Sequence, residues 1–155
     1  MSKDLVIVWA GRHRRDRWEE LVSGYRDRVA RFVRITDKPV KVSASGTLEE
    51  RQRSESPKLM EAVPAGSWTI ALDRRGEALD SPSLAKRLGQ LVDEWQDPIC
   101  FVLGSDVGLS AEFCEGCRSV LSFGPMTLPH ELARLVLYEQ IYRALAIRAG
   151  INYHR

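Results

Sequence analysis

The sequence predicts an α/β fold, with a mostly parallel five-stranded sheet that carries helices on both faces. Short apolar runs alternate along the chain with longer segments whose apolar residues recur at helical spacing, which is typical of parallel strands joined by helices. The chain has 155 residues and contains no linker, internal repeat or low-complexity segment. We therefore expect a single domain that spans residues 1–155.

The first third of the chain is expected to form a strand, a helix and a second strand. Leu5 to Ala10 is a short apolar run that ends at Gly11, as a buried parallel strand would. A helix is expected from about Asp16 to Phe32, and the next strand from Val40 to Ser43. The apolar side chains of this helix that are expected to face the core are Trp18, Leu21, Val22, Tyr25, Val29 and Phe32.

The middle of the chain carries clear helix-start signals. Thr47 and Glu50 have the spacing of a capping box. Ser56-Pro57 looks like a second helix start, so this region is either two short helices or one bent helix. A strand is expected from Trp68 to Leu72, closed by a turn at Asp73 to Gly76. Ser81-Pro82 opens the next helix.

The last third is expected to contain two strands and two helices. Ile99 to Leu103 and Val120 to Phe123 are the apolar runs. Ser110 is expected to cap a short helix that reaches about Cys117, and Pro129 to open the last helix, which ends at Gly150. The side chains of the last helix that are expected to face inward are Leu132, Leu135, Val136, Ile141 and Leu145.

Composition narrows the functional class. No apolar run is long enough to span a membrane, and the apolar amino end lacks the flanks of a signal peptide, so we expect a cytoplasmic protein with no membrane partner.

The chain has three cysteines, an odd number that argues against a disulfide framework. Cys114 and Cys117 form a C-x-x-C without a second pair or a nearby histidine. Two small helix residues are the simpler interpretation, and no metal site is expected.

Charge is concentrated near the amino end. The net charge is only +2, yet residues 12 to 41 hold ten Lys and Arg against five Asp and Glu. A basic segment of this kind attracts phosphate backbones, although a solvated helix face explains it equally well.

Three features of the last third point to a ligand site. Gly104 follows a buried strand, where a glycine allows close backbone approach or a positive φ. The segment Phe123 to Leu128 is a non-repetitive loop between a strand and a helix. His130 lies at the positive end of the last helix, which favours a neutral imidazole that can accept a proton. An ordinary turn, a structural loop and a capping histidine are the alternative interpretations.

Three stretches of the sequence resemble one protein family. The run MTLPHELARLVLYEQIYRALAIRAGINYHR (Met126 to Arg155) is the most specific. The run IALDRRGEALDSPSLAKRL (Ile70 to Leu88) and the amino-terminal LVIVWAG with WEELVSGYRDRVARF extend the likeness nearly end to end. They are similar to the ribosomal RNA large subunit methyltransferase H family. Its members are small SPOUT-class enzymes that methylate N3 of a pseudouridine in 23S ribosomal RNA.

The resemblance implies a specific fold and assembly. SPOUT enzymes thread the carboxyl end of the chain through a loop to form a trefoil knot. They are homodimers in which the paired knots build each site. The family works on assembled ribosomes, so the implied partners are ribosomal RNA, the ribosome and a second copy of the chain.

The resemblance also implies roles for particular residues. The methyl donor S-adenosylmethionine, the only cofactor implied, would be held by eight residues. They are Leu72, Gly104, Phe123, Gly124, Pro125, Met126, Thr127 and Leu128. The tail residues Tyr153, His154 and Arg155 would contact the target nucleotide. His130, or His154, is the candidate base, and Arg155 could stabilise the anion that forms on the target base.

The sequence departs from the family at two places. Ser105, Asp106 and Val107 stand where the family has a second glycine, then proline or alanine, then an acidic or variable residue. Gly124-Pro125 stands where the family usually has a serine and a variable residue. A Cβ at Ser105 could change how the donor fits. A non-catalytic RNA-binding or ribosome-binding protein on the same fold, or a methyltransferase for another RNA, therefore remains an alternative.

Overall fold

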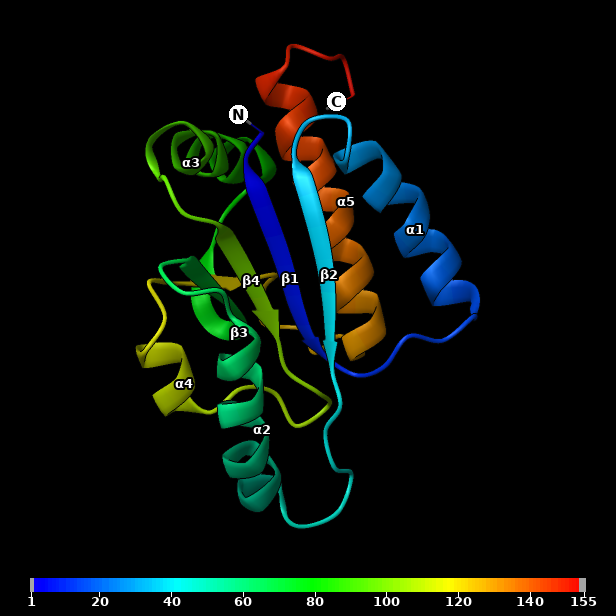
Figure 1. Ribbon diagram of the computed structural model, residues 1–155, viewed down its shortest axis with the longest axis vertical. Coiled ribbons are helices and arrows are strands. Elements are labelled where there is room, and N and C mark those ends of the chain that lie inside the picture. Colours follow the sequence, from blue (N-terminus) through cyan, green and yellow to red (C-terminus); the bar gives the residue numbers. More distant parts are fainter. Residues whose placement is uncertain (1, 154–155) are drawn as a thin grey trace.

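A computed structural model describes residues 2–153 and contains a five-stranded, fully parallel sheet with the strand order β2-β1-β4-β3-β5 (Figure 1). The α/β class, the five strands and the helices on both faces are confirmed. In chain order the elements are β1 (Asp4–Ala10), α1 (Arg17–Val29), β2 (Arg34–Val40), α2 (Leu48–Ala62), β3 (Trp68–Ala78), α3 (Ser81–Glu94), β4 (Ile99–Leu103), α4 (Ala111–Glu115), β5 (Ser119–Ser122) and α5 (His130–Arg148).

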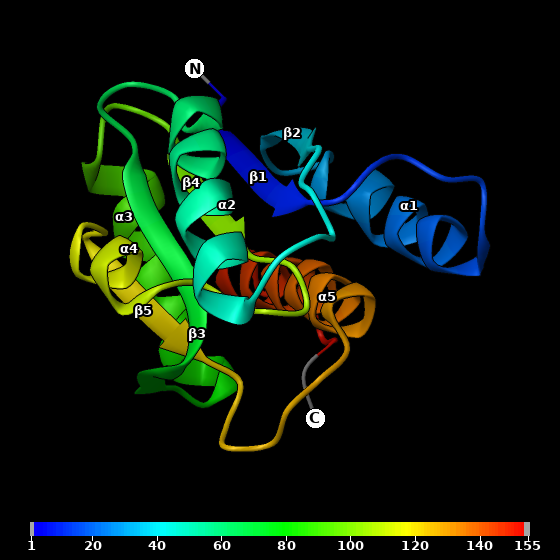
Figure 2. The ribbon, with the colours of Figure 1, turned by 90° about the horizontal axis from the view of Figure 1, so that it is seen from below.

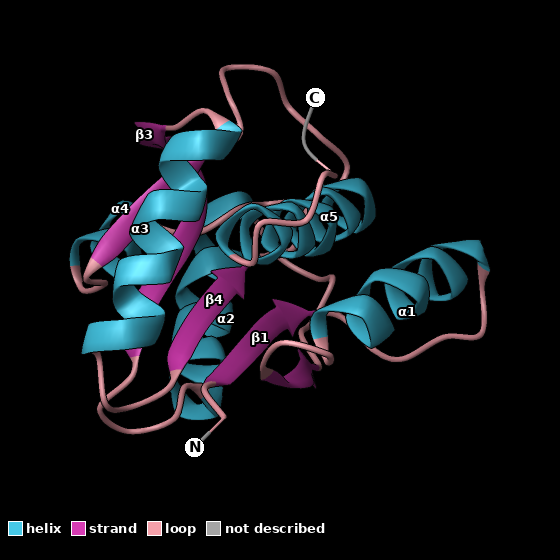
Figure 3. Cartoon of the chain, turned by 90° about the horizontal axis from the view of Figure 1, so that it is seen from above, coloured by secondary structure: helices cyan, strands magenta, loops and turns pink. Residues whose placement is uncertain are grey.

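The helices divide into two layers. α1, α3 and α5 pack on one face of the sheet, and α2 and α4 pack on the other (Figure 2). Successive residues of β1 and β4 alternate between the two cores, and both strands are almost completely buried because helices cover both faces. On the first face α1 and α5 lie side by side (Figure 3).

The helix starts follow the sequence signals closely. Thr47 and Glu50 form the expected capping box, and Ser110 caps α4. Asp80, one residue before the predicted start, is the N-cap of α3 and accepts a hydrogen bond from the Ser83 N–H. Each cap satisfies a backbone donor that would otherwise have no partner in the first turn of the helix.

The second strand was predicted at the wrong place. β2 runs from Arg34 to Val40 and ends where the sequence placed its beginning. It is an edge strand beside β1, so its sequence is polar and mostly partly exposed rather than apolar. The edge position also tolerates Pro39, because a proline has no backbone N–H to donate and therefore fits only where no neighbouring strand needs one.

Two boundaries in the middle of the chain also differ from the prediction. α2 is one helix that contains Pro57, and the Ser56 hydroxyl donates to the Gln52 carbonyl instead of starting a second helix. β3 does not stop at Leu72 but continues to Ala78, with an irregular pairing to β5 between Leu72 and Glu77. The predicted turn at Asp73 to Gly76 is this irregularity.

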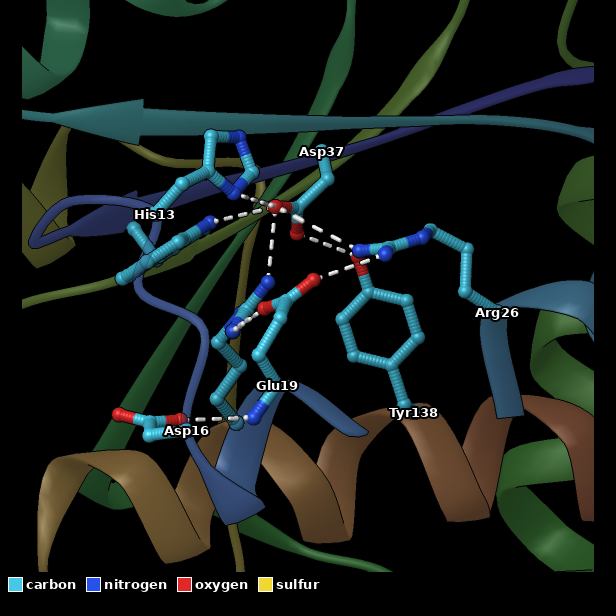
Figure 4. A network of polar contacts seen from close by, with 8 residues as sticks. His13, Asp16, Glu19, Arg26, Asp37 and Tyr138 are labelled. Carbon is cyan, nitrogen blue, oxygen red and sulfur yellow. Dashed lines mark hydrogen bonds and ion pairs between the residues drawn. The ribbon is translucent and has the colours of Figure 1, made fainter. Parts of the chain in front are cut away.

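A buried carboxylate joins the sheet to α1 and α5. The Asp37 side chain on β2 is 6% exposed and accepts hydrogen bonds from Trp9 Nε1 (3.1 Å), an Arg134 amino group (2.8 Å) and the Tyr138 hydroxyl (2.5 Å) (Figure 4). Glu19 of α1 accepts from the same Arg134 guanidinium at 3.1 Å. Burial and the Asp37 carboxylate raise the pKa of Tyr138, so its hydroxyl remains a donor.

The direction of α5 separates its two ends. It begins with His130 at the carboxyl edge of the sheet and runs back toward the edge where the strands begin (Figure 1). Its 19 residues correspond to a length of about 28 Å. Among residues 2–153, no helix combines the length and the apolar character that crossing a membrane would need.

We expect replacement of Asp37 by alanine to lower the free energy of unfolding by about 3–5 kcal/mol, because the buried Arg134 guanidinium would lose its main partner. Urea unfolding followed by circular dichroism measures this loss. Asp27→Ala on the exposed side of α1 removes the same charge and should change stability by less than about 0.5 kcal/mol. Equal effects of the two substitutions would contradict a structural role for the Asp37 network.

Candidate functional site

Two cavities meet at the carboxyl edge of the sheet. The first, which we call the loop cavity, has a volume of about 480 Å³ and lies between the ends of β3, β4 and β5 and the loop before α5. It is lined by seven of the eight residues predicted to hold the donor, and by His130. These seven are Leu72, Gly104, Phe123, Gly124, Met126, Thr127 and Leu128. Pro125, the eighth, is exposed and does not line the cavity.

The loop over this cavity, residues 123–128, is held near its start by hydrogen bonds, and three of its backbone N–H groups have no partner among the described residues. The Ser122 hydroxyl binds both the N–H (3.0 Å) and the carbonyl (3.2 Å) of Gly124, which has a φ of +110°. Within residues 2–153, the N–H groups of Met126, Thr127 and Leu128 make no hydrogen bond to the protein. They are therefore available to a polar ligand.

A tight turn forms the opposite wall. A Cβ on Gly104 would lie 2.9 Å from the carbonyl carbon of Gly108, closer than packed atoms tolerate. Gly108 itself has a φ of +71° and donates to the Ser105 carbonyl at 2.9 Å. Gly104 does not have a positive φ, so this glycine is needed because the turn folds against it.

The residues that depart from the family pattern anchor this turn to α2. The Ser105 hydroxyl donates to both carboxylate oxygens of Glu55, at 2.7 and 2.9 Å, and Glu55 is only 2% exposed. Arg51 donates to Asp106 at 2.6 Å, and this hydrogen bond lowers the pKa of Asp106. Gln52 donates to the Val107 carbonyl at 2.7 Å. The hydroxyl of Ser105 is therefore bound by the protein itself.

His130 lies where both cavities can reach it. Its side chain is 38% exposed, and its Nε2 atom is 3.2 Å from a carboxylate oxygen of Glu131. It lines the loop cavity and also the second cavity described below. This position at the junction gives the imidazole access to ligands in either cavity.

The described part of the tail lies far from His130. The Tyr153 ring packs edge-on against Tyr142, with 4.8 Å between the ring centroids, and lies under the Arg143 guanidinium. All three residues are in the carboxyl-terminal half of α5 or beyond it. His154 and Arg155, the other predicted tail contacts, lie outside the described residues. One chain therefore does not bring Tyr153 and His130 together.

The second cavity, which we call the basic cavity, was not predicted from the sequence. It has a volume of about 350 Å³ and shares Leu103, Gly104 and His130 with the loop cavity. Its other walls come from the segment after β1, the start of α1, the end of β2 and the start of α5. The additional lining residues are Trp9, Ala10, Gly11, Arg12, Arg14, Asp16, Trp18, Glu19, Lys41, Val42, Glu131 and Arg134. The only signal in the sequence was the basic run between residues 12 and 41.

The C-x-x-C thiols have the properties of packed side chains. Cys114 is in the core between α4 and the sheet, and Cys117 contacts that core. Burial raises the pKa of Cys114, and it raises the pKa of Cys117 to about 11, so both remain thiols at neutral pH. Residues 2–153 contain no group of three or more His, Cys, Asp and Glu side chains placed to hold a metal ion.

Comparison with known proteins identifies the family. A family model described as "Predicted SPOUT methyltransferase" matches residues 4–154. The ribosomal RNA large subunit methyltransferase H of Rhodospirillum centenum is 41% identical over 97% of this chain and 98% of its own length. The protein of the same name from Pelobacter propionicus is 32% identical over 97% and 98%.

The chain belongs to the ribosomal RNA large subunit methyltransferase H family of SPOUT methyltransferases. The resemblance found in its sequence is thereby confirmed. A solved structure of a probable methyltransferase from Bordetella pertussis has the same fold, with a TM-score of 0.54 and 17% identity over 93% of this chain and 95% of that one. The trefoil knot stays a prediction from the resemblance.

We expect Gly104→Ala to destabilise the protein by about 1–3 kcal/mol, because the new Cβ forces the turn at Gly108 to move. Gly24→Ala is the matched control. Gly24 lies inside α1, where an added Cβ would meet no other atom within 4 Å, and the substitution should gain about 0.5–1 kcal/mol because alanine is the better helix former. Thermal or urea unfolding measures both, and a Gly104→Ala protein as stable as the wild type would contradict the close packing of this turn.

Proposed function

We propose that the protein transfers a methyl group from S-adenosylmethionine to N3 of a pseudouridine in 23S ribosomal RNA. The observation that carries this proposal is the loop cavity, where the fold gathers seven residues that the family resemblance assigns to donor binding. Membership of the methyltransferase H family supports the reaction class and the RNA substrate.

The loop cavity fits the chemistry of the proposed donor. Apolar side chains such as Leu72 and Leu128 can cover the adenine ring, and the open N–H groups of residues 126–128 can bind its nitrogens or the ribose. Ser105 lines the cavity, but its hydroxyl donates to Glu55 and is therefore not an open donor in the cavity. The donor supplies an activated methyl group on a sulfonium, and the protein aligns it with the acceptor nitrogen.

The residues proposed for acceptor chemistry come from both ends of α5. The N3 proton of the pseudouridine must leave before or during methyl transfer, and His130 or His154 is the proposed base. Arg155 is proposed to stabilise the negative charge that develops on the target base. The Tyr153 ring is proposed to contact the target nucleotide beside Arg155.

We propose a homodimer because one chain cannot complete this site. Tyr153 packs about one helix length away from His130 within its own chain. A second copy placed with its tail against the loop cavity would supply Tyr153, His154 and Arg155. This arrangement agrees with the paired-knot assembly that the resemblance implies.

The proposed setting is the cytoplasm, on assembled ribosomes, with residues 1–155 acting as a single domain. A chain this small has few surfaces with which to recognise one nucleotide in a long RNA. A large assembled target that presents the nucleotide relieves the protein of that task, and no metal takes part in the proposed transfer.

The proposal predicts that purified protein transfers labelled methyl groups from S-adenosylmethionine to ribosomes that lack the modification, and less well to free ribosomal RNA. Mapping of the label should find a pseudouridine in the large-subunit RNA. If another RNA were labelled instead, the protein would still be a methyltransferase, but the proposed substrate would be wrong. An absence of both label and donor binding would support a non-catalytic protein on this fold.

A tail deletion separates donor binding from transfer. We expect removal of residues 153–155 to leave donor affinity, measured by calorimetry, within about twofold, while transfer to ribosomes falls by at least about 100-fold because orientation of the acceptor is lost. Asn152→Ala, an exposed substitution in the same segment, is the control and should retain activity. Full activity of the deleted protein would remove the tail from the proposed site.

A further inference from the structure

We propose that the basic cavity binds the single-stranded RNA that flanks the target nucleotide, with Arg12, Arg14 and Lys41 on phosphates and Trp18 on a base. This inference rests on the proposed RNA methyl transfer and deepens it by giving the substrate strand a path. The cavity and the loop cavity share Gly104 and His130 as a common wall, so a strand in one leads directly to a donor in the other.

The cavity has three cations that form no ion pair with another residue in the described part of the chain. Arg12 and Arg14 follow β1, and Lys41 follows β2, so the parallel strands carry all three to the same edge. Their side chains are exposed, and they make no hydrogen bond or ion pair with any other residue in the range 2–153. Unpaired cations that converge on one cavity are the usual arrangement for binding a phosphate backbone.

Three carboxylates also line the cavity, and each has a partner within the described part of the chain. The Asp16 carboxylate caps α1 by accepting from the Glu19 N–H at 3.0 Å. Glu19 is held by Arg26 at 2.8 Å and by Arg134 at 3.1 Å. The Glu131 carboxylate lies 3.2 Å from His130. Of these three carboxylates, Glu19 alone is paired with arginines, so the three unpaired cations face the charges of Asp16 and Glu131 and outnumber them.

Trp18 adds an aromatic surface. The sequence predicted that it faces the core, but it belongs to neither hydrophobic core and instead lines the basic cavity, partly exposed. An aromatic ring beside unpaired cations suits an unstacked base followed by its phosphates, which is how single strands are commonly bound. A duplex would not offer a base face to this ring.

The floor of the cavity is held by buried polar contacts. Arg134 is 6% exposed, its guanidinium carbon lies 3.9 Å from the Trp9 ring centroid, and it is bound by Glu19 and Asp37. Since this floor is built from β1, β2, α1 and α5, the cations extend from a preformed surface. A preformed site loses less free energy to ordering when a strand binds.

The first test compares two triple variants of equal charge. Arg12→Ala/Arg14→Ala/Lys41→Ala alters the cavity, whereas Arg53→Ala/Lys58→Ala/Lys86→Ala removes three exposed cations on α2 and α3 that line neither cavity. The probe is a fluorescein-labelled oligouridylate of about ten nucleotides, measured by anisotropy over a series of KCl concentrations. The cavity variant should bind on the order of tenfold more weakly, and the slope of the logarithm of its affinity against the logarithm of the KCl concentration should be about 2 smaller in magnitude. The control variant should bind nearly as tightly as the wild type.

The second test examines stacking. Trp18→Ala should weaken binding of the oligouridylate by about tenfold or more but leave binding of an abasic oligonucleotide of the same length unchanged, and Trp18→Phe should retain most of the affinity. An equal loss for both oligonucleotides would overturn the stacking contact. Circular dichroism of each variant shows that the fold is retained.

The outcomes separate this inference from the proposed function. If the cavity variant binds the oligouridylate as the wild type does, the inference is overturned, even if methyl transfer to ribosomes is normal. If that variant keeps RNA affinity but loses ribosome affinity, the cavity binds an acidic protein surface instead, and the inference is overturned as well. If the wild type neither binds S-adenosylmethionine nor transfers methyl groups, the proposed function fails, while a selective loss of RNA binding in the cavity variant would still support the RNA path.

Discussion

The position of α5 on the sheet depends on one buried carboxylate. Asp37, on an edge strand, receives hydrogen bonds from Arg134 and Tyr138, which are four residues apart and so lie on the same face of α5. Because one carboxylate binds both side chains, α5 can neither slide nor rotate without leaving buried polar groups unpaired. Glu19 extends the network to α1, so α1 and α5 are placed by polar contacts as well as by apolar packing.

This placement has opposite consequences for the two ends of α5. At its start, His130 is held at the junction of the two cavities, next to the turn at Gly104. At its end, the chain turns back and Tyr153 packs on Tyr142 of the same helix. A rigid helix of about 28 Å cannot bring its own two ends together. The interaction that orders one half of the proposed site therefore leaves Tyr153 away from it, which is the reason for proposing that a second copy of the chain supplies the other half.

The sequence predicted those parts of the structure that depend on local or regular patterns. The buried strands β1 and β4, the Thr47 cap and the loop at residues 123–128 follow from apolar runs, cap residues and the family resemblance. The edge strand β2 was misplaced because edge strands need no apolar run.

The inward face of α5 was also misassigned: Leu132 and Val136 are only partly buried, while Arg134 and Tyr138 are buried. Hydrophobic periodicity cannot anticipate a charged residue whose partner is about 100 residues away in the sequence. The basic cavity could not be predicted either. It forms only where the ends of β1 and β2 lie side by side, and hydrophobic periodicity does not show which strands are neighbours.

Complementation between two inactive variants tests most directly whether two chains share one site. A Gly104→Val protein, impaired in the loop cavity, would be mixed with a protein that lacks residues 153–155, and subunits would be allowed to exchange. The shared-site account predicts that methyl transfer returns in the mixture, because each mixed dimer contains one intact loop cavity facing one intact tail. If mixed dimers form, as native mass spectrometry would show, and the mixture remains as inactive as its components, then each chain completes its own site and the account is wrong.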